Sequence, residues 1–234
     1  MITNKFKLIV LALSMASMLS AQSQTIVHGT QSMLDKLRLN NSIKGIQDMH
    51  YSEIDGNPYM YEDFVEGKVY MKNGDIFSAS LRYDVNADQV QFKANDNIYV
   101  LINQEQIKKV EMGDKNFVYS DYLVSKGEKG PDGSGYFIVL ADGKYKLLAR
   151  KNMRIQDPTP SKGFLEPKPA KFIMQSDTYY IKSEDGKAVR VKSKADLVEL
   201  FAGNEDVSYF LETNKIKVNR LEDLIKVVNF CNSL

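Results

Sequence analysis

The sequence predicts an α+β protein. An antiparallel β-meander of about eight strands is expected to form a curled sheet or half-barrel. A Pro-rich connector, a β-hairpin and three short C-terminal helices follow it. Three observations support this class. Apolar and polar residues alternate in short runs between residues 59 and 155, which is typical of half-buried strands. Four prolines lie between residues 156 and 169. After residue 193 the apolar spacing changes to the period of amphipathic helices.

The first 21 residues have the layout of a cleavable export signal. Lys5 and Lys7 precede an uncharged apolar run at 8–19, which ends in small residues up to Ala21. The run is shorter than the roughly 20 residues that cross a membrane. We therefore expect export, cleavage near Ala21, a periplasmic or secreted mature chain, and no membrane span within it.

The remaining chain divides by composition. Proline fixes φ and lacks an amide donor, so the connector is expected to lack regular structure and to mark the main boundary. The expected organisation is a signal peptide at 1–21, an N-terminal segment at 22–55, the meander at 56–156, the connector at 157–170, and the hairpin with the helices at 171–234. The N-terminal segment is either irregular or contains one short helix near 33–37.

The meander begins with a clear hairpin. Apolar and charged side chains alternate in the strand expected at 64–71, and Asn73-Gly74 follows, a pair that tolerates the positive φ of a tight turn. In the return strand at 76–83, alternate residues face inward. A run that is apolar throughout, 98–102, is expected to be covered on both faces. The other expected strands lie near 90–92, 107–112, 117–124, 136–140 and 145–151, with a Gly-rich loop at 127–135.

Turn and capping signals organise the C-terminal segment. Glu184-Asp185-Gly186 predicts the turn of the β-hairpin. Ser193 with Asp196 predicts a capping box, and Asn204 predicts the cap of a second helix. Asn219 with Glu222 predicts a further capping box for the third helix.

Charge and cysteine content exclude some classes of partner. Without Lys5 and Lys7 the 31 Lys and Arg residues fall to 29, against 30 Asp and Glu, a net charge of −1. A balanced surface favours neither nucleic acid nor anionic lipid. Cys231 is the only cysteine, so no internal disulfide forms, and we expect it to pack inside the last helix.

No motif that carries chemistry is found, so no catalytic, cofactor-binding or metal-ligating residue is predicted. His28 and His50 lack the spacing of zinc ligands. Ser134 lies between Gly133 and Gly135, but it lacks the strand-to-helix elbow of a serine nucleophile.

One acidic stretch has part of the pattern of a calcium-binding loop. Asp84, Asn86 and Asp88 have the D-x-N-x-D spacing that opens such a loop, but its sixth position is Gln89 and its twelfth Asn95, in place of Gly and Glu. Because Asp and Asn also favour turns, a turn is the preferred interpretation and weak calcium binding the alternative.

Two further expectations concern the sheet. If Arg82 lies among apolar neighbours, it must be paired, and Asp84 or Asp88 is the expected partner because they are nearest in sequence; its role would be structural first and ligand-anchoring second. The inner face either fills the core, the ordinary outcome for small curled sheets, or encloses a small apolar ligand. That face is predicted to comprise Phe77, Leu81, Tyr83, Val90 and Phe92.

Several short stretches resemble a group of exported proteins of Gram-negative bacteria that have no assigned activity. They are Gly56-Asn57-Pro58-Tyr59, Phe64 with Gly67, Leu81-Arg82-Tyr83-Asp84, Val90-Gln91-Phe92, Tyr179-Tyr180-Ile181, Leu221-Glu222-Asp223-Leu224-Ile225 and Asn232-Ser233-Leu234. The resemblance implies export and the same layout of sheet and helices. It implies no activity, cofactor or catalytic residue.

These observations favour an exported, non-enzymatic binding or structural protein of the cell envelope, because constellations that carry chemistry are missing. One alternative is a protein–protein interaction module that uses the C-terminal helices or a sheet edge. The other is an enzyme of unrecognised type. The expected partner is a small apolar ligand or an envelope protein.

Overall fold

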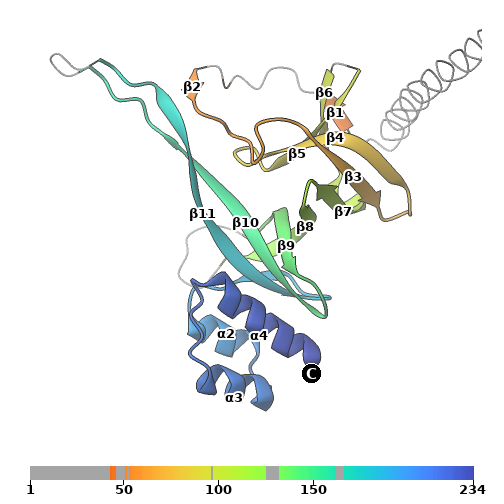
Figure 1. Cartoon of the computed structure of the whole chain (residues 1–234), viewed down its shortest axis with the longest axis vertical. Helices are drawn as coiled ribbons and strands as arrows, with labels where there is room; N and C mark the ends of the chain where they lie inside the picture. The colour runs from red at the N-terminus through yellow and green to blue at the C-terminus, as the bar shows by residue number, and fades with distance from the viewer. Residues whose placement is uncertain (1–42, 46–50, 52, 96, 125–131, 162–165) are drawn as a thin grey trace, which may run out of the picture.

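The computed structural model describes residues 43–45, 51, 53–95, 97–124, 132–161 and 166–234. The expected signal peptide, the alternative helix near 33–37 and both histidines lie outside these residues. The described chain is mostly β-strand with three short helices at its C-terminal end (Figure 1), which confirms the predicted α+β class.

The described strands come first in the chain, with one short 3-10 helix between β6 and β7, and the α-helices follow them. The strands are β1 (Ile43–Gly45), β2 (Ile54–Asp55), β3 (Val65–Met71), β4 (Ile76–Asp84), β5 (Gln89–Ala94), β6 (Asn97–Leu101), β7 (Ile107–Met112), β8 (Lys115–Leu123), β9 (Gly133–Ala141), β10 (Tyr145–Gln156), β11 (Ala170–Ser183) and β12 (Ala188–Arg190). The helical segments are η1 (Gln104–Gln106), α2 (Lys194–Leu200), α3 (Glu205–Thr213) and α4 (Leu221–Ser233).

The predicted Asn73-Gly74 hairpin is confirmed. Gly74 takes a φ of 95°, and β3 and β4 pair antiparallel with Val69 opposite Phe77. The expected inward residues of β4 are buried, as are Val90 and Phe92 of β5. The expectation for β6 holds only at its end, where Val100 and Leu101 are both buried while the start of the strand is half-buried or exposed.

The described strands form one sheet in the order β1-β6-β5-β4-β3-β7-β8-β12-β11-β10-β9. The sheet departs from the expected simple meander at one point, because β7 follows β6 in the chain but pairs antiparallel with β3. This return places the apolar residues of β7 over those of β3 and β4, where Val110 and Met112 are fully buried.

Five strands of the sheet close into a ring, β8-β9-β10-β11-β12. β8 pairs antiparallel with β9, and β12 closes the ring by pairing parallel with β8, Ala188 opposite Tyr122. Alternate side chains point into the ring, because strand side chains alternate between faces. Phe137, Leu148 and Tyr180 pack with Ala188 in this interior.

The described residues of the expected Pro-rich connector extend a long hairpin. β10 and β11 pair from Tyr145↔Ser183 to Gln156↔Lys171, and a bridge joins Thr159 to Lys168 beyond the strand ends. The hairpin runs away from the helices as a projecting arm (Figure 1). Strands from both sides of the segment expected to be a boundary therefore belong to one sheet.

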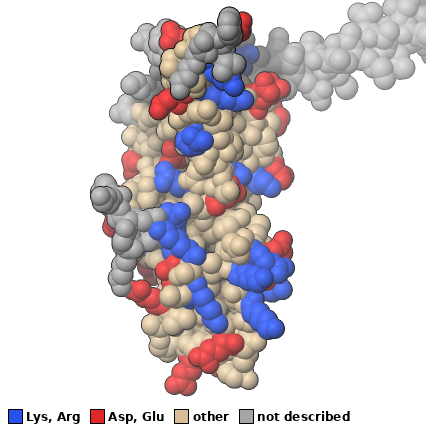
Figure 2. Space-filling model, turned by 90° about the vertical axis from the view of Figure 1, so that its left-hand side faces the viewer, with Lys and Arg blue, Asp and Glu red and all other residues tan. Residues whose placement is uncertain are grey.

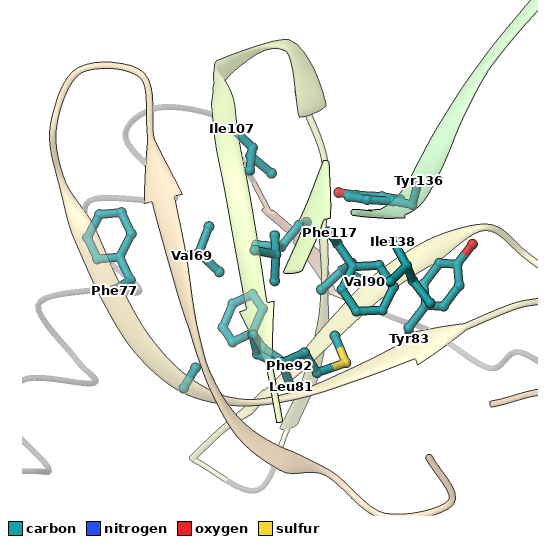
Figure 3. Packing of buried hydrophobic residues seen from close by; sticks show 14 of the residues in the cluster. Val69, Phe77, Leu81, Tyr83, Val90, Phe92, Ile107, Phe117, Tyr136 and Ile138 are labelled. Atoms are coloured by element: carbon teal, nitrogen blue, oxygen red, sulfur yellow. The ribbon is translucent and has the colours of Figure 1, made fainter. Parts of the chain in front are cut away.

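The largest core lies inside the curl of β3 to β9 (Figure 3). Tyr83, Val90 and Ile138 point toward one another there. A second core joins the sheet to the helices, with Leu147 and Ile181 of β10 and β11 against Leu224 and Val228 of α4. The 171–234 segment thus contributes β11 and β12 to the sheet and packs its helices on it.

The helix caps agree with two of the three predicted signals. Ser193 and Asp196 form the predicted capping box, and the Asn204 side chain accepts from the Val207 amide. The Asn219 box is wrong: α4 begins one residue later, with Arg220 at the N-cap and no side-chain cap. Asp223 accepts instead from the Lys217 amide at 3.1 Å. Within the described part of the chain, none of the helices combines the length and apolarity that membrane crossing requires.

Candidate functional site

A polar cleft of about 760 Å³ opens at one end of the strand ring. The end of β8, the middle of β10 and β11, and β12 all contribute to its wall. The lining residues are Tyr122, Leu123, Val124, Arg150, Asn152, Gln175, Ser176, Asp177, Thr178, Tyr180 and Arg190. A pocket of this size is within the range of small-molecule sites, roughly 300–1,000 Å³.

A β-bulge shapes the cleft. Arg150 pairs with Thr178 and Asn152 with Gln175, so β11 carries one extra residue between these two pairs. The Asn152 amide donates to the Ser176 carbonyl at 3.0 Å and to the Thr178 hydroxyl at 3.3 Å. Bulges redirect side chains and are frequent beside functional sites. Here the Asn152 side chain holds the bulge in place.

Aromatic rings form the floor of the cleft. Tyr122 and Tyr180 meet edge to face with ring centroids 5.8 Å apart, and Phe137 of the ring interior lies 5.0 Å from Tyr180. Gly133 makes room for this floor, since a Cβ there would lie 2.7 Å from the Tyr122 hydroxyl. Glycine within a strand often marks a close approach of this kind.

Asp88 and Tyr122 hold the Arg150 side chain in position. Its Nη2 donates to Asp88 Oδ2 at 3.0 Å, and its guanidinium lies 4.8 Å from the centroid of the Tyr122 ring. Asp88 Oδ1 in turn accepts from the Tyr83 hydroxyl at 2.7 Å and from the Tyr136 amide at 3.1 Å. The Arg150 guanidinium is therefore fixed by a carboxylate that is itself fixed.

Electrostatics keep Arg150 charged. Burial by itself lowers its pKa, but the Asp88 carboxylate and the Tyr122 hydroxyl outweigh burial and raise the pKa overall. A guanidinium carries five N–H donors, so Arg150 can also donate to a ligand in the cleft while it keeps its bond to Asp88.

A second arginine, Arg190 of β12, lines the same cleft. The one carboxylate in the lining, Asp177, is bonded to Lys151 at 3.0 Å. Lys and Arg side chains gather over the middle and lower part of the side on which β11 and α2 lie (Figure 2). The cleft therefore combines two guanidinium groups with amide and hydroxyl groups, a set that suits an anionic ligand.

Two smaller clefts adjoin it. One, of about 540 Å³, shares Ser176, Asp177, Thr178 and Arg190 with the first. The other, of about 580 Å³, shares Leu123, Val124 and Arg190 and continues to α2. Arg190 lines all three, so it lies at their junction.

Arg82, which sequence patterns single out, lies elsewhere. The expected pairing with Asp84 or Asp88 is wrong: Arg82 donates to Gln91 Oε1 from Nε at 3.2 Å and from Nη2 at 2.9 Å. Its guanidinium also lies 3.5 Å from the centroid of the Tyr59 ring. The cause is strand register, because β4 and β5 place Arg82 opposite Gln91.

The acidic turn behaves as a turn. Asp84 Oδ1 accepts from the Ala87 amide at 2.9 Å, and its Oδ2 accepts from the Tyr51 hydroxyl at 3.0 Å. Asp88 is bound to Arg150. Within the described ranges no group of three or more His, Cys, Asp or Glu has the geometry of a metal site.

The other candidates from the sequence have structural surroundings. The expected inner face of the curl is buried in the main core, and none of the three clefts is lined by it. Ser134 lies in β9 and not in the Gly-rich loop expected at 127–135. Its hydroxyl donates to the Asp121 carboxylate at 2.6 Å. Cys231 is buried as predicted, which raises the pKa of its thiol to about 11.

Sequence patterns missed Arg150, Arg190 and Asn152. One local signal was present: Gly133 and Gly135 alternate within a strand, which indicates close approach on one face. Comparisons with protein-family models, with curated proteins and with solved structures find no match for this chain.

Proposed function

We propose that the protein is an exported, non-enzymatic binding protein of the cell envelope, and that it binds an anionic ligand in the cleft at the end of the strand ring. Two arginines that line one cleft of about 760 Å³ are the observation that carries the proposal. Export rests on the N-terminal sequence pattern.

The chemistry of the lining favours binding over catalysis. The residues that line this cleft include two tyrosines, two arginines, amides and hydroxyls, but neither histidine nor cysteine. Asp177 is engaged by Lys151, and Asp88 by Arg150 and Tyr83. Such a set recognises carboxylate or phosphate groups by donating hydrogen bonds, without a base or a nucleophile.

The test starts from the mature protein purified from the envelope fraction of its own host and weighed by native mass spectrometry. We expect a bound non-protein mass that is retained in Arg154→Gln, an exposed arginine on the projecting arm, and lost in Arg190→Gln and Arg150→Gln. A mass retained in both cleft variants, or a bare chain from the host, would contradict the proposal. Cleavage near Ala21 is read from the same mass.

A second candidate, strand addition by a protein partner, has one observation in its favour. Among the described strands, β11 has no neighbour on one edge between its pairings with β2 at 170–171 and with β12 at 180–181. An open edge can accept an extended peptide. The bulge beside Ser176 counts against it, because bulges twist an edge away from pairing. Co-purification of a second protein would favour this candidate.

A further inference from the structure

We infer that the ligand is an anionic amphiphile, with its charged group in the polar cleft and one unbranched apolar chain in the adjoining cleft beside α2. This inference rests on the proposed function and adds the chemical class of the ligand. It follows from the contrast between two clefts that meet at Arg190.

Four of the nine residues that line the adjoining cleft are apolar. Leu123 and Val124 at the end of β8, Val189 of β12 and Leu200 of α2 line it. Leu123 is 36% exposed, so a large apolar side chain stays in contact with solvent at this junction. Covering such a surface with an alkyl chain is favourable by about 0.8 kcal/mol for each fully buried methylene group.

Strand geometry explains why an apolar and a polar cleft meet. Val189 and Arg190 are consecutive in β12 and therefore point to opposite faces. Leu123 pairs with Val189, while Tyr122 pairs with Ala188. The end of the β8–β12 pair thus presents aromatic and guanidinium groups on the ring side and aliphatic groups on the outer side, while Leu123, Val124 and Arg190 line both clefts.

Charge in the polar cleft favours an anionic head group, because Arg150 and Arg190 line it and its one carboxylate, Asp177, is bonded to Lys151. The lining of the apolar cleft includes two cations and two carboxylates, those of Arg190, Lys192, Asp196 and Glu199, and therefore adds no preference. The Asp196 carboxylate at its rim is occupied by the amides of Lys192 and Ser193 in the capping box, at 2.7 and 2.8 Å. A cationic head group would face two arginines, and an uncharged chain would leave the polar cleft without a ligand group.

The volumes fit a single molecule. The polar cleft of about 760 Å³ and the apolar cleft of about 580 Å³ are each within the range of pockets for small molecules. A ligand that spans both would have a head group rich in acceptors and a chain of medium length.

The test is calorimetric titration of the mature protein with three probes: butyl phosphate, decyl phosphate and decyltrimethylammonium, the last two below their micelle concentrations. We expect decyl phosphate to bind at least tenfold more tightly than butyl phosphate, since about six further methylene groups are partly buried. We expect no binding of decyltrimethylammonium.

Each outcome separates the two proposals. Equal affinity for both phosphates overturns the apolar chain but leaves the anion site standing. If neither butyl phosphate nor decyl phosphate binds, the anion site is overturned, and with it the proposed function. Binding of decyltrimethylammonium as tight as that of decyl phosphate shows unspecific apolar adsorption and overturns the inference.

Variants locate the two halves of the ligand. Val189→Ser, at a residue that lines the apolar cleft but not the polar one, is expected to lower the affinity for decyl phosphate about fivefold and to leave butyl phosphate unchanged, whereas Arg190→Gln lowers both. Val198→Ser is the matched control, because Val198 is a 49% exposed apolar residue of α2 outside the cleft lining. Equal losses in the Val189 and Val198 variants would overturn the placement of the chain.

Discussion

Asp88 and Arg150, 62 residues apart in the chain, form an ion pair at 3.0 Å that joins the main core to the cleft. Asp88 lies in the turn between β4 and β5 with a φ of 53°, a left-handed conformation that Asp tolerates. Arg150 comes from β10 of the strand ring. The pair therefore fixes the position of a cleft residue relative to the curl of the sheet.

Gly135→Ala is expected to break this pair. A Cβ at Gly135 would lie 2.5 Å from Asp88 Oδ2 and 3.2 Å from Arg150 Nη2, so the two charged groups must move. We expect a loss of about 2 kcal/mol in the free energy of unfolding, as in other overpacked sites. Urea denaturation measures it. Ser134→Ala, at the exposed neighbouring position, is the control, and equal effects of the two substitutions would contradict the prediction.

The filled core predicts the response of Leu81, whose side chain is fully buried. A Cβ on Gly67 would lie 2.6 Å from Leu81 Cδ1, which shows how little space surrounds it. Leu81→Ala is expected to cost about 3 kcal/mol through the cavity that it leaves. Leu81→Trp is expected to cost about as much through overpacking. A Trp variant as stable as the natural protein would instead indicate a ligand-sized space inside the curl.

Local signals predicted local structure well. Asn73-Gly74 and Ser193 with Asp196 act within a few residues of themselves, and both produce the expected turn and cap. Alternation likewise identified the buried face of β4, because one period places all its apolar side chains on the same side. These features depend on backbone conformation and burial that a short window of sequence contains.

The strand order and the cleft depend on long-range pairing and could not be predicted in the same way. Nothing local to β7 indicates that it pairs with β3, and nothing local to Arg150 indicates Asp88 as its partner. Arg82 shows why a partner cannot be chosen by distance along the sequence. It bonds to Gln91, which strand register places opposite it, and not to the carboxylates nearest in sequence. The cleft arises where β8, β10, β11 and β12 meet.

Ser193 and Asn219 look like equivalent capping residues in the sequence, but only Ser193 caps a helix. Ser193→Ala is expected to cost about 1 kcal/mol, because its hydroxyl accepts from the Asp196 amide at the start of α2. Asn219→Ala is expected to have little effect, because Asn219 does not cap α4. Thermal or urea unfolding of the two variants measures the difference. A larger loss for Asn219→Ala would contradict the observed start of α4.

The carboxyl of Asp84 predicts how stability depends on pH. Its side chain is fully buried, and burial raises its pKa above 3.8 even though the Ala87 amide and the Tyr51 hydroxyl donate to it and lower the pKa. Between 3.8 and the folded pKa, the folded protein holds a proton that the unfolded chain has released. The contribution of Asp84 to stability is therefore greatest at low pH and falls as the pH rises through this window.

Asp84→Asn removes this titration while it keeps an acceptor for the Ala87 amide. We expect the free energy of unfolding of the natural protein, minus that of the variant, to fall as the pH rises from 3.8 and then to level off. Urea denaturation in small pH steps from pH 3.5 to roughly pH 7 measures the difference. Asp185→Asn changes the same chemical group in the exposed turn before β12 and serves as the control. A difference that rises with pH would mean that the hydrogen bonds to the ionised carboxylate outweigh its burial.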